Sequence, residues 1–496
     1  MMAAVLSVLL TIAALTIHPL PEGTQLHIRL TTTVGSYAST SGSPVSALLI
    51  APVRVGGETV LQAGSTLSGK VKTVTRVGFG VRHETAGLDL EFTELTPLDR
   101  DPMPISARIT EVDNSREHVT QDGSIQGVRS TGSLSYRVSG YLRTALQWEV
   151  HAALADWVIR SFIMELPEPE IYYPAGVELT LALTQPLSLD APFHEQQASR
   201  QLTGDQRDEL VRDVAAMPYR TQAPASGRPS DVTNVMFIGS HEQIAAAFAA
   251  AGWTQADPAS FRRRINWIRA VGELRGDVAA PMSLLLLNGA EPDMSWEKGL
   301  NDVSKRHHIR MWREDTTWRG RQMWVGAATR DIDFAYMRRG GRLSHKIEHD
   351  VDQERDKVAY DLAFTSCGNL LDWTDRADFP RLASNATGDP IITDGRMVVV
   401  ELNDCDAPRL STETVDSTPL PEHGDRWQRF ARREVLSARN GLLRTNPYWR
   451  AYEGSRLLVE WIRRRRQPSP GPELSSTSHA SSGFFQSLRV VAARMQ

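Results

Sequence analysis

Two stretches far apart in the chain have closely similar sequences. PEGTQLHIRLT begins at Pro21 and PAGVELTLALT begins at Pro174, and in both a Pro-x-Gly turn precedes alternating apolar residues. Alternation with a period of two is typical of a strand with one buried face, and glycine supplies the turn. QAGSTLSGKV at Gln62 repeats only the Gly-x-x-Leu core, so no third full copy supports a tandem repeat. The match predicts the first and last strands of one barrel or sandwich, entered through the same turn.

The surrounding region, residues 20–190, is rich in predicted strands. STLSGKVKTV and AGLDLEFTEL alternate in the same way between Gly and Pro turn signals. Residues 117–135 are polar and rich in Gly and Ser, which predicts a loop. Apolar residues then recur at helical spacing from Leu146 to Ile163, which predicts one inserted amphipathic helix. Residues 191–230 are polar and contain QAPASGRPSD, a composition typical of a linker.

From Asp231 onward, predicted strands alternate with predicted helices. NVMFIGS has the pattern of a buried strand, and HEQIAAAFAAAGW that of a helix with Ser240 as its N-cap and Gly252 at its end. PMSLLLL, HIRMWRE, QMWVGAAT and RMVVVEL are further predicted strands, and residues 261–271 and 350–371 are further predicted helices. We therefore expect an α/β mixed-sheet domain over 231–415. The 496-residue chain as a whole is predicted to be an α+β multidomain protein.

The C-terminal part is strongly basic. Residues 416–466 contain two predicted amphipathic helices, Arg426–Leu442 and Asn446–Arg466, and residues 467–496 have the composition of a disordered low-complexity tail. From Ser417 onward there are 14 Arg and no Lys against 6 acidic residues, a net charge of +8 in a chain whose total is −4. This segment favours an anionic envelope component or a membrane surface as partner, and no nucleic-acid partner is expected.

The first 19 residues contain a nearly unbroken apolar run from Ala3 to Ile17. Its length suits the apolar region of a signal peptide, while the missing positive residues and cleavage motif leave an uncleaved anchor or a buried first strand open. We expect export, to the periplasm or cell envelope. Elsewhere the composition, 41% hydrophobic and 23% charged, excludes a multi-span membrane protein.

The chain has two cysteines, Cys367 and Cys405. A pair is compatible with one disulfide in an oxidising compartment or with two buried thiols, and the thiols are the favoured interpretation. Because there is no CxxC motif or Cys/His cluster, a zinc ribbon or an iron–sulfur site is not expected.

The stretch HKIEHDVDQERD, residues 345–356, concentrates histidines and acids. On a helix, His345, His349, Asp352 and Asp356 would share one face, and histidines four residues apart can bind one metal ion. The competing interpretation is a solvated helix face with local ion pairs such as Glu354 with Lys357, and it is the commoner of the two.

A second candidate stretch is SKRHHIRMWRED, residues 304–315. Strand alternation places His307 on one face and His308, Arg310 and Trp312 on the other. Arg306, His308 and Arg310 could then bind a phosphate or carboxylate, because guanidinium groups bind oxyanions in a bidentate manner. The alternative is a ladder of cation–π contacts on an exposed strand.

A third candidate, VGAATRDIDF, places Asp331 and Asp333 beyond a buried strand, where sheet domains often carry ligand groups and where ordinary turn residues also occur. The three clusters fall on adjacent predicted elements, so a strand–hairpin–helix unit could bring them to one edge. His307, His308 and His345 are the candidate metal ligands, and a divalent metal ion is the candidate cofactor. No Gly-x-Ser-x-Gly elbow, P-loop, Rossmann fingerprint or HExxH motif occurs.

Three blocks together resemble the LssY C-terminal domain family, a bacterial envelope-associated module. They are SDVTNVMFIGSHEQIAAAFAAAGWTQADP, KRHHIRMWRE with MWVGAATRDI, and LSHKIEHDVDQERDKVAYDL. The resemblance covers residues 231–405. In some relatives the module follows a membrane-embedded phosphatase domain, which this chain lacks. The family pattern has proline at the position of His349, which implies a helix that begins near Asp350 and leaves His345 before it.

Two functions remain open at this stage. One is a hydrolase for phosphate- or carboxylate-bearing envelope substrates, with His308, His345, Asp331 and Asp352 as catalytic groups. Arg306, Arg310 and Trp312 would then bind the substrate. The other is a non-catalytic envelope adaptor or secretion-associated binding protein, with a membrane phosphatase or secretion component as a further candidate partner.

Overall fold

The computed structural model describes residues 18–133, 167–189, 202–256, 282–337, 342–405 and 424–448, except for 56–57, 99, 225 and 377–378. A few single residues between and after these ranges are also described. Several expectations fall outside the described residues: the N-terminal apolar run up to residue 17, the helix at 146–163, and the tail at 467–496. The helix at 261–271 and the second C-terminal helix at 446–466 lie outside them for the most part.

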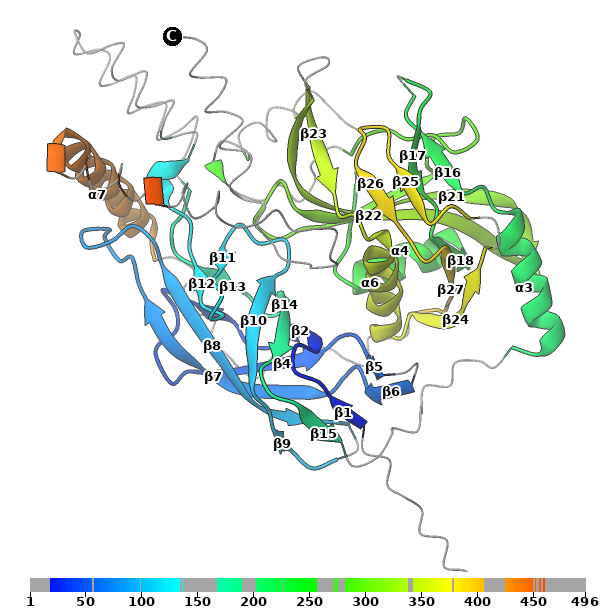
Figure 1. Cartoon of the computed structure of the whole chain (residues 1–496), viewed down its shortest axis with the longest axis horizontal. Coiled ribbons are helices and arrows are strands. Elements are labelled where there is room, and N and C mark those ends of the chain that lie inside the picture. Colours follow the sequence, from blue (N-terminus) through cyan, green and yellow to red (C-terminus); the bar gives the residue numbers. More distant parts are fainter. Residues whose placement is uncertain are drawn as a thin grey trace, which may run out of the picture.

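The N-terminal domain is a nine-stranded antiparallel sheet that curls into a nearly closed barrel (Figure 1). Its path runs β10-β14-β2-β4-β7-β8-β12-β11, with β9 beside β8. The strands are β2 (Gln25–Leu30), β4 (Pro44–Leu49), β7 (Thr66–Thr75), β8 (Gly87–Thr96), β9 (Met103–Pro104), β10 (Ala107–Val112), β11 (His118–Val119), β12 (Ile125–Gln126) and β14 (Glu178–Leu183).

Small accessory pairs surround the barrel. They are β1 (His18–Leu20) with β15 (Leu187–Leu189), β3 (Val34–Gly35) with β13 (Tyr172–Tyr173), and β5 (Val53–Val55) with β6 (Glu58–Leu61). A short 3-10 helix, η1, spans Ser130–Gly132.

The two similar stretches of the sequence are β2 and β14, the first and last strands of the nine-stranded sheet in chain order, as predicted. β2 and β14 pair antiparallel, with Leu26 opposite Leu181. Gly23 and Gly176 both have a positive φ, of 86° and 100°, which only glycine adopts without strain. Each glycine N–H donates to the end of the other strand, Gly23 to the carbonyl of Leu183 and Gly176 to that of Leu30. The repeated turn therefore closes both ends of one strand pair.

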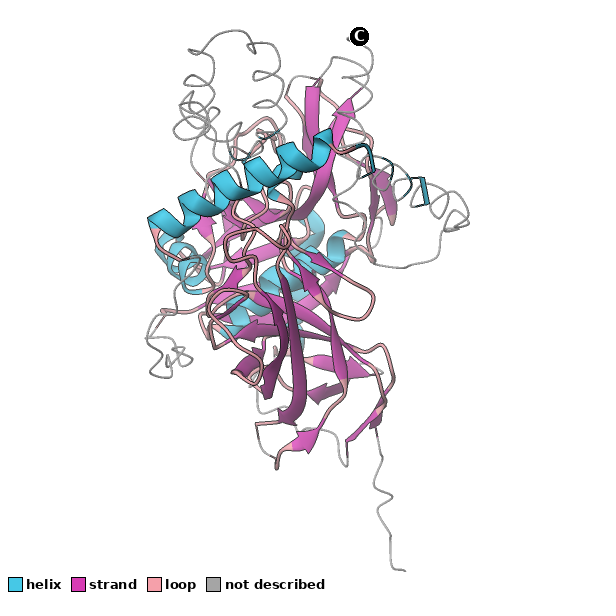
Figure 2. Ribbon diagram, turned by 90° about the vertical axis from the view of Figure 1, so that its left-hand side faces the viewer, coloured by secondary structure: helices cyan, strands magenta, loops and turns pink. Residues whose placement is uncertain are grey.

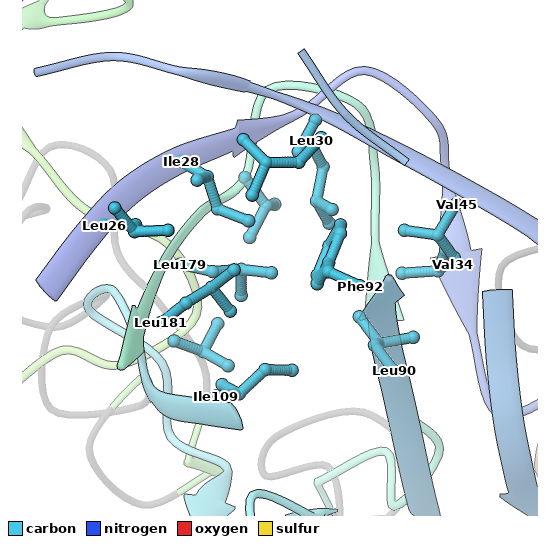
Figure 3. Close-up of a cluster of buried hydrophobic side chains, with 14 of the residues drawn as sticks. Leu26, Ile28, Leu30, Val34, Val45, Leu90, Phe92, Ile109, Leu179 and Leu181 are labelled. Carbon is cyan, nitrogen blue, oxygen red and sulfur yellow. The ribbon is translucent and has the colours of Figure 1, made fainter. Parts of the chain in front are cut away.

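Alternate residues of these strands form the barrel core. Leu26, Ile28 and Leu30 are fully buried, and Leu179 and Leu181 face them from β14. Figure 3 shows these side chains pointing toward one another and toward Phe92, Leu90 and Ile109. The period-two pattern in the sequence is thus the pattern of burial.

The central domain is an eight-stranded mixed sheet with the path β19-β20-β21-β22-β18-β27-β24 and with β23 beside β22. Among the described strands of this sheet, β18 and β27 are the one pair that runs in parallel. The strands are β18 (Val235–Ile238), β19 (Thr254–Gln255), β20 (Met294–Lys298), β21 (Arg306–Trp318), β22 (Arg321–Met337), β23 (Arg342–Ile347), β24 (Gly368–Asp375) and β27 (Arg396–Leu402). Two small pairs lie beside the sheet: β16 (Arg220–Gln222) with β17 (Pro229–Val232), and β25 (Leu382–Ser384) with β26 (Pro390–Ile392).

Helices cover both faces of this sheet. On one face, α4 (His241–Ala250) and α6 (Val351–Phe364) pack on Val235, Phe237 and Val400. On the other face, α3 (Gly204–Ala216) packs on Met236, Ile238 and similar residues. Ser240 caps α4 as predicted, and it forms a capping box with Gln243. The α/β mixed-sheet prediction is confirmed.

Several local predictions are wrong. The supposed linker contains α3, whose Leu210 and Val214 are buried, and the β16–β17 pair. PMSLLLL, predicted as a strand, forms only isolated β-bridges at Leu286 and Leu287. Asn288 and Gly289 adopt positive φ and turn the chain directly after Leu287, so that no strand continues.

The helix predicted to reach Leu371 ends at Phe364. Ser366, with φ of 62°, is in the left-handed conformation that ends helices, and β24 follows. Cys367 and Cys405 form a disulfide, so the favoured interpretation as two thiols is also wrong.

The C-terminal helix α7 (Arg426–Thr445) returns to the barrel (Figure 1). Figure 2 shows it as the long helix across the front of the molecule. Among the described residues, no helix is both long and apolar enough to cross a bilayer.

Candidate functional site

Three neighbouring strands carry most of the predicted site residues. In β21, His307 and His308 point to opposite faces, as predicted: Ile309 and Met311 join the core beneath α4 and α6, and Trp312 joins the core beneath α3. β22 pairs with β21 on one side and with β23 on the other, so that Asp331 lies opposite both Arg306 and Ile347. This register brings Asp331 between His308 and His345.

We call Arg306, His308, Arg310, Asp331 and His345 the inner cluster. Asp331 is its centre: Oδ2 lies 3.2 Å from His345 Nδ1 and 3.3 Å from Arg306 Nε, and Oδ1 lies 3.7 Å from His308 Nδ1. His308 Nε2 lies 2.7 Å from the hydroxyl of Thr329. The structure therefore places Arg306, His308 and His345 around the carboxylate of Asp331, and the charge of Arg310 acts on His308.

Burial determines the protonation of this cluster. It lowers the pKa of His308 to about 3, with further lowering by Arg310 and Arg306, and it also lowers the pKa of His345. Burial alone would raise the pKa of Asp331, but His345, His308 and Arg306 lower it overall. Near neutral pH the cluster thus holds two neutral imidazoles and one carboxylate.

Both arginines of the cluster are already bound to carboxylates of the protein. Arg306 is 2.9 Å from Glu297 as well as 3.3 Å from Asp331. Arg310 is 3.3 Å from Asp231, and its Nε donates to the carbonyl of Ser283 at 3.1 Å. Both side chains are buried. The oxyanion positions that the sequence suggested for a substrate are therefore occupied by side chains of the chain itself.

His307 belongs to a different cluster. Its Nε2 is 2.7 Å from Asp113, the residue that follows β10, and its Nδ1 is 2.5 Å from Glu354 of α6. Burial would lower the pKa of His307, but these two carboxylates raise it to about 9, so the ring is an imidazolium that donates from both nitrogens. Among the described residues, no group of three or more His, Cys, Asp or Glu side chains is arranged to bind a metal ion.

A family model described as LssY C-terminus matches residues 214–397. This segment is an LssY C-terminal domain. The match begins within α3, which belongs to the central domain in the structure. A search of curated proteins found no match.

A search of solved structures matched ComB10 of the Com Type IV secretion system of Helicobacter pylori. The identity is 9%, the match covers 36% of this chain and 93% of that chain, and the TM-score is 0.20.

Other predicted residues lie elsewhere in the LssY C-terminal domain. Asp352 is in the first turn of α6, where it accepts hydrogen bonds from Arg355, Thr393 and the backbone of Asp394. Trp312 is buried and donates to the carbonyl of Ala290 at 3.1 Å. Among the described residues, no hydrogen bond joins Asp352 or Trp312 to the inner cluster.

The four-residue helix face proposed for residues 345–356 does not form. His345 lies in β23, and α6 begins only after its N-cap, Asp350. His349 precedes that cap, and its Nδ1 lies 3.3 Å from the carbonyl of Pro390. The helix start implied by the family pattern is confirmed, whereas the shared helical face is wrong.

Sequence reasoning missed the charged contact between the barrel and the LssY C-terminal domain. Glu178 of β14 binds Lys298 at 2.8 Å and Lys357 at 2.7 Å, and Asp361 binds the same two lysines at 2.8 and 2.7 Å. Arg29 of β2 binds Glu178 at 2.7 Å.

We call the whole set the interdomain cluster. Its members are Arg29, Glu111, Asp113, Glu178, Lys298, His307, Arg330, Glu354, Lys357 and Asp361. The spacing of Lys357 and Asp361 at i, i+4 on one helix was the one feature of the local sequence that could have indicated this cluster.

Proposed function

We propose that this protein is a non-catalytic adaptor of the cell envelope, in which the LssY C-terminal domain is a rigid body and an anionic partner binds the basic C-terminal segment. The observation that carries the proposal is the internal neutralisation of Arg306 and Arg310. A buried arginine that already binds a buried carboxylate is not available to a substrate oxyanion unless that carboxylate leaves.

Three further features support an envelope location. The disulfide between Cys367 and Cys405 is of a kind that persists in oxidising compartments and is rare in the cytosol. The apolar N-terminal run suits an export signal. The match to the LssY C-terminal family is compatible with an envelope location.

One observation favours a second candidate function, hydrolysis. The side chain of His345 is 20% exposed, while its Nδ1 lies 3.2 Å from the buried carboxylate of Asp331. A carboxylate that orients one ring nitrogen leaves the other for proton transfer, which is the usual arrangement of a general base. In this alternative His345 is the base, Asp331 orients it, and His308 completes the site.

A turnover assay separates the two functions. The full-length protein is incubated with generic phosphoesters and carboxylic esters, with and without Zn²⁺ or Mn²⁺, beside the variants His345→Ala and His349→Ala. His349 is the matched control, because it lies four residues away and outside the inner cluster. We expect the three proteins to show the same background rate. Turnover that is lost in His345→Ala and kept in His349→Ala would replace the adaptor with the hydrolase.

A further inference from the structure

We propose that the LssY C-terminal domain has a recognition surface for an acidic peptide segment of a partner protein, and that the barrel occupies this surface in an autoinhibitory contact. The surface is the face that contacts residues 111–117, EVDNSRE, at the end of β10 and in the turn after it. We call these residues the docking segment. The inference goes beyond the proposed adaptor function, because it assigns a second partner to a surface other than the basic C-terminal segment.

Two carboxylates begin the docking segment. Glu111 and Asp113 both bind Arg330 of β22, Asp113 at 2.9 Å. Asp113 also lies 2.7 Å from His307 of β21. Charge-assisted hydrogen bonds of this kind are stronger than those between neutral groups. Acidic side chains at alternate positions of the segment therefore meet cations on two neighbouring strands of the LssY C-terminal domain.

The rest of the docking segment is held largely through its backbone. Lys305 donates to the carbonyl of Ser115 at 2.9 Å. The side chain of Asn301 accepts from the backbone N–H of Arg116 at 2.9 Å and donates to Glu117 at 2.8 Å. Contacts to the main chain, combined with a few selective side-chain contacts, are the way in which domains bind peptides. The LssY C-terminal domain thus holds one short, continuous stretch of the barrel as it would hold a bound peptide.

The contact between the two domains has little apolar content. The barrel core lies within residues 20–187, and Leu300 is the one described residue of the other domain that packs against it. The described cores of the LssY C-terminal domain contain no barrel residue. Polar interfaces within a chain resemble transient protein–protein interfaces, and motion between the domains is expected of them. Each domain therefore keeps its own core when this contact opens.

Charge selects the chemistry of the partner. In the interdomain cluster, the barrel contributes one cation and three carboxylates, a net charge of −2: Arg29, Glu111, Asp113 and Glu178. The LssY C-terminal domain contributes four cations and two carboxylates, a net charge of +2: Lys298, His307, Arg330, Lys357, Glu354 and Asp361.

Opening of the contact leaves the positive set without its counter-charge, so the exposed face favours an acidic partner. The hydrogen bonds of Lys305 and Asn301 to backbone groups favour a polypeptide over a lipid headgroup.

Fluorescence anisotropy of the full-length protein with a labelled peptide, ARITEVDNSRE, residues 107–117, tests the proposal. We expect the peptide to bind, and a peptide with Gln and Asn in place of Glu111 and Asp113 to bind about tenfold more weakly. The barrel competes for the surface, so the wild type binds with an affinity reduced to the fraction of open molecules.

The variant Asp113→Asn of the full-length protein weakens this internal competitor. It should therefore bind the peptide about tenfold more tightly than the wild type, because more molecules are open. Adding Arg330→Gln to Asp113→Asn removes the cation that both carboxylates bind, and it should cancel that gain. A loss of stability alone would not tighten the binding of an acidic peptide.

Two further variants guard the test. Glu94→Gln makes the same kind of change at an exposed carboxylate of β8 outside the contact, and it should bind as the wild type does. Glu111 is 32% exposed, so Glu111→Gln is a milder change than Asp113→Asn, and it should also tighten binding.

Equal binding of the two peptides overturns the proposal, and so does unchanged affinity in both Asp113→Asn and Glu111→Gln. A doubled mass of Asp113→Asn in light scattering overturns it in favour of barrels exchanged between two copies of the chain. None of these results depends on turnover or on the basic C-terminal segment, so a failure here leaves the adaptor function standing.

Discussion

The protonated state of His307 predicts a specific loss of stability in mild alkali. The ring is 3% exposed, and its pKa is raised from 6.5 to about 9 by Asp113 and Glu354. A group whose pKa is raised on folding contributes its full stabilisation below its unfolded pKa and loses it as pH rises through its folded pKa. The window is therefore about pH 6.5 to 9. Raising the pKa of His307 from 6.5 to about 9 corresponds to about 3 kcal/mol of unfolding free energy.

Urea unfolding at several pH values across this window is the measurement. The wild type should lose about 3 kcal/mol between pH 6.5 and 9, and His307→Gln should lose far less over the same range while being less stable throughout the acid half. His349→Gln removes a histidine outside both clusters and should retain the wild-type slope. The reasoning fails if the wild type is equally stable at both ends of the window, or if His307→Gln keeps the slope.

Two further predictions concern contacts between distant parts of the chain. Lys298→Met leaves the buried carboxylates of Glu178 and Asp361 with one cation fewer, and it should lower the free energy of unfolding in urea by about 3 to 5 kcal/mol. The control Lys70→Met removes a cation from an exposed ion pair and should change the free energy of unfolding by less than about 0.5 kcal/mol. Cys367→Ser removes the disulfide that closes a loop of 38 residues, and it should lower the free energy of unfolding by about 4 kcal/mol. A reductant should lower the stability of the wild type by the same amount and should leave the stability of the variant unchanged.

The parts of the fold that the sequence predicts well depend on local patterns. Alternation along a strand is a property of neighbouring residues, so it assigned His307 and His308 to opposite faces before any pairing was known. The shared Pro-x-Gly turn predicted that β2 and β14 are the first and last strands of one barrel, because the same local sequence forms the same turn before each strand. The N-cap at Ser240 is likewise decided within four residues.

The site was predicted less completely because its partners are remote in sequence. His307 meets Asp113 across 194 positions, and Arg29 meets Glu178 across 149. No local pattern distinguishes a carboxylate that will neutralise a histidine from one that stays in solvent. Arg306 and Arg310 were predicted to bind a substrate oxyanion because their carboxylate partners are also remote. Asp231, for example, is 79 positions from Arg310. Cys367 and Cys405 also looked like separate thiols until β24 and β27 placed them side by side.

The interdomain cluster has a charge balance that explains why His307 must be charged. Its cations are Arg29, Lys298, His307, Arg330 and Lys357, and its carboxylates are Glu111, Asp113, Glu178, Glu354 and Asp361. With His307 protonated the two sets cancel, and with it neutral one negative charge stays uncompensated at a largely buried contact, where charge is most costly.

Members of the cluster come from both domains, and α7 is fixed to the barrel by Arg432. Among the described residues, ion pairs therefore join the barrel to the LssY C-terminal domain on one side and to α7 on the other. The proposed adaptor would use this connection, because a partner at the C-terminal segment would then act on both domains together.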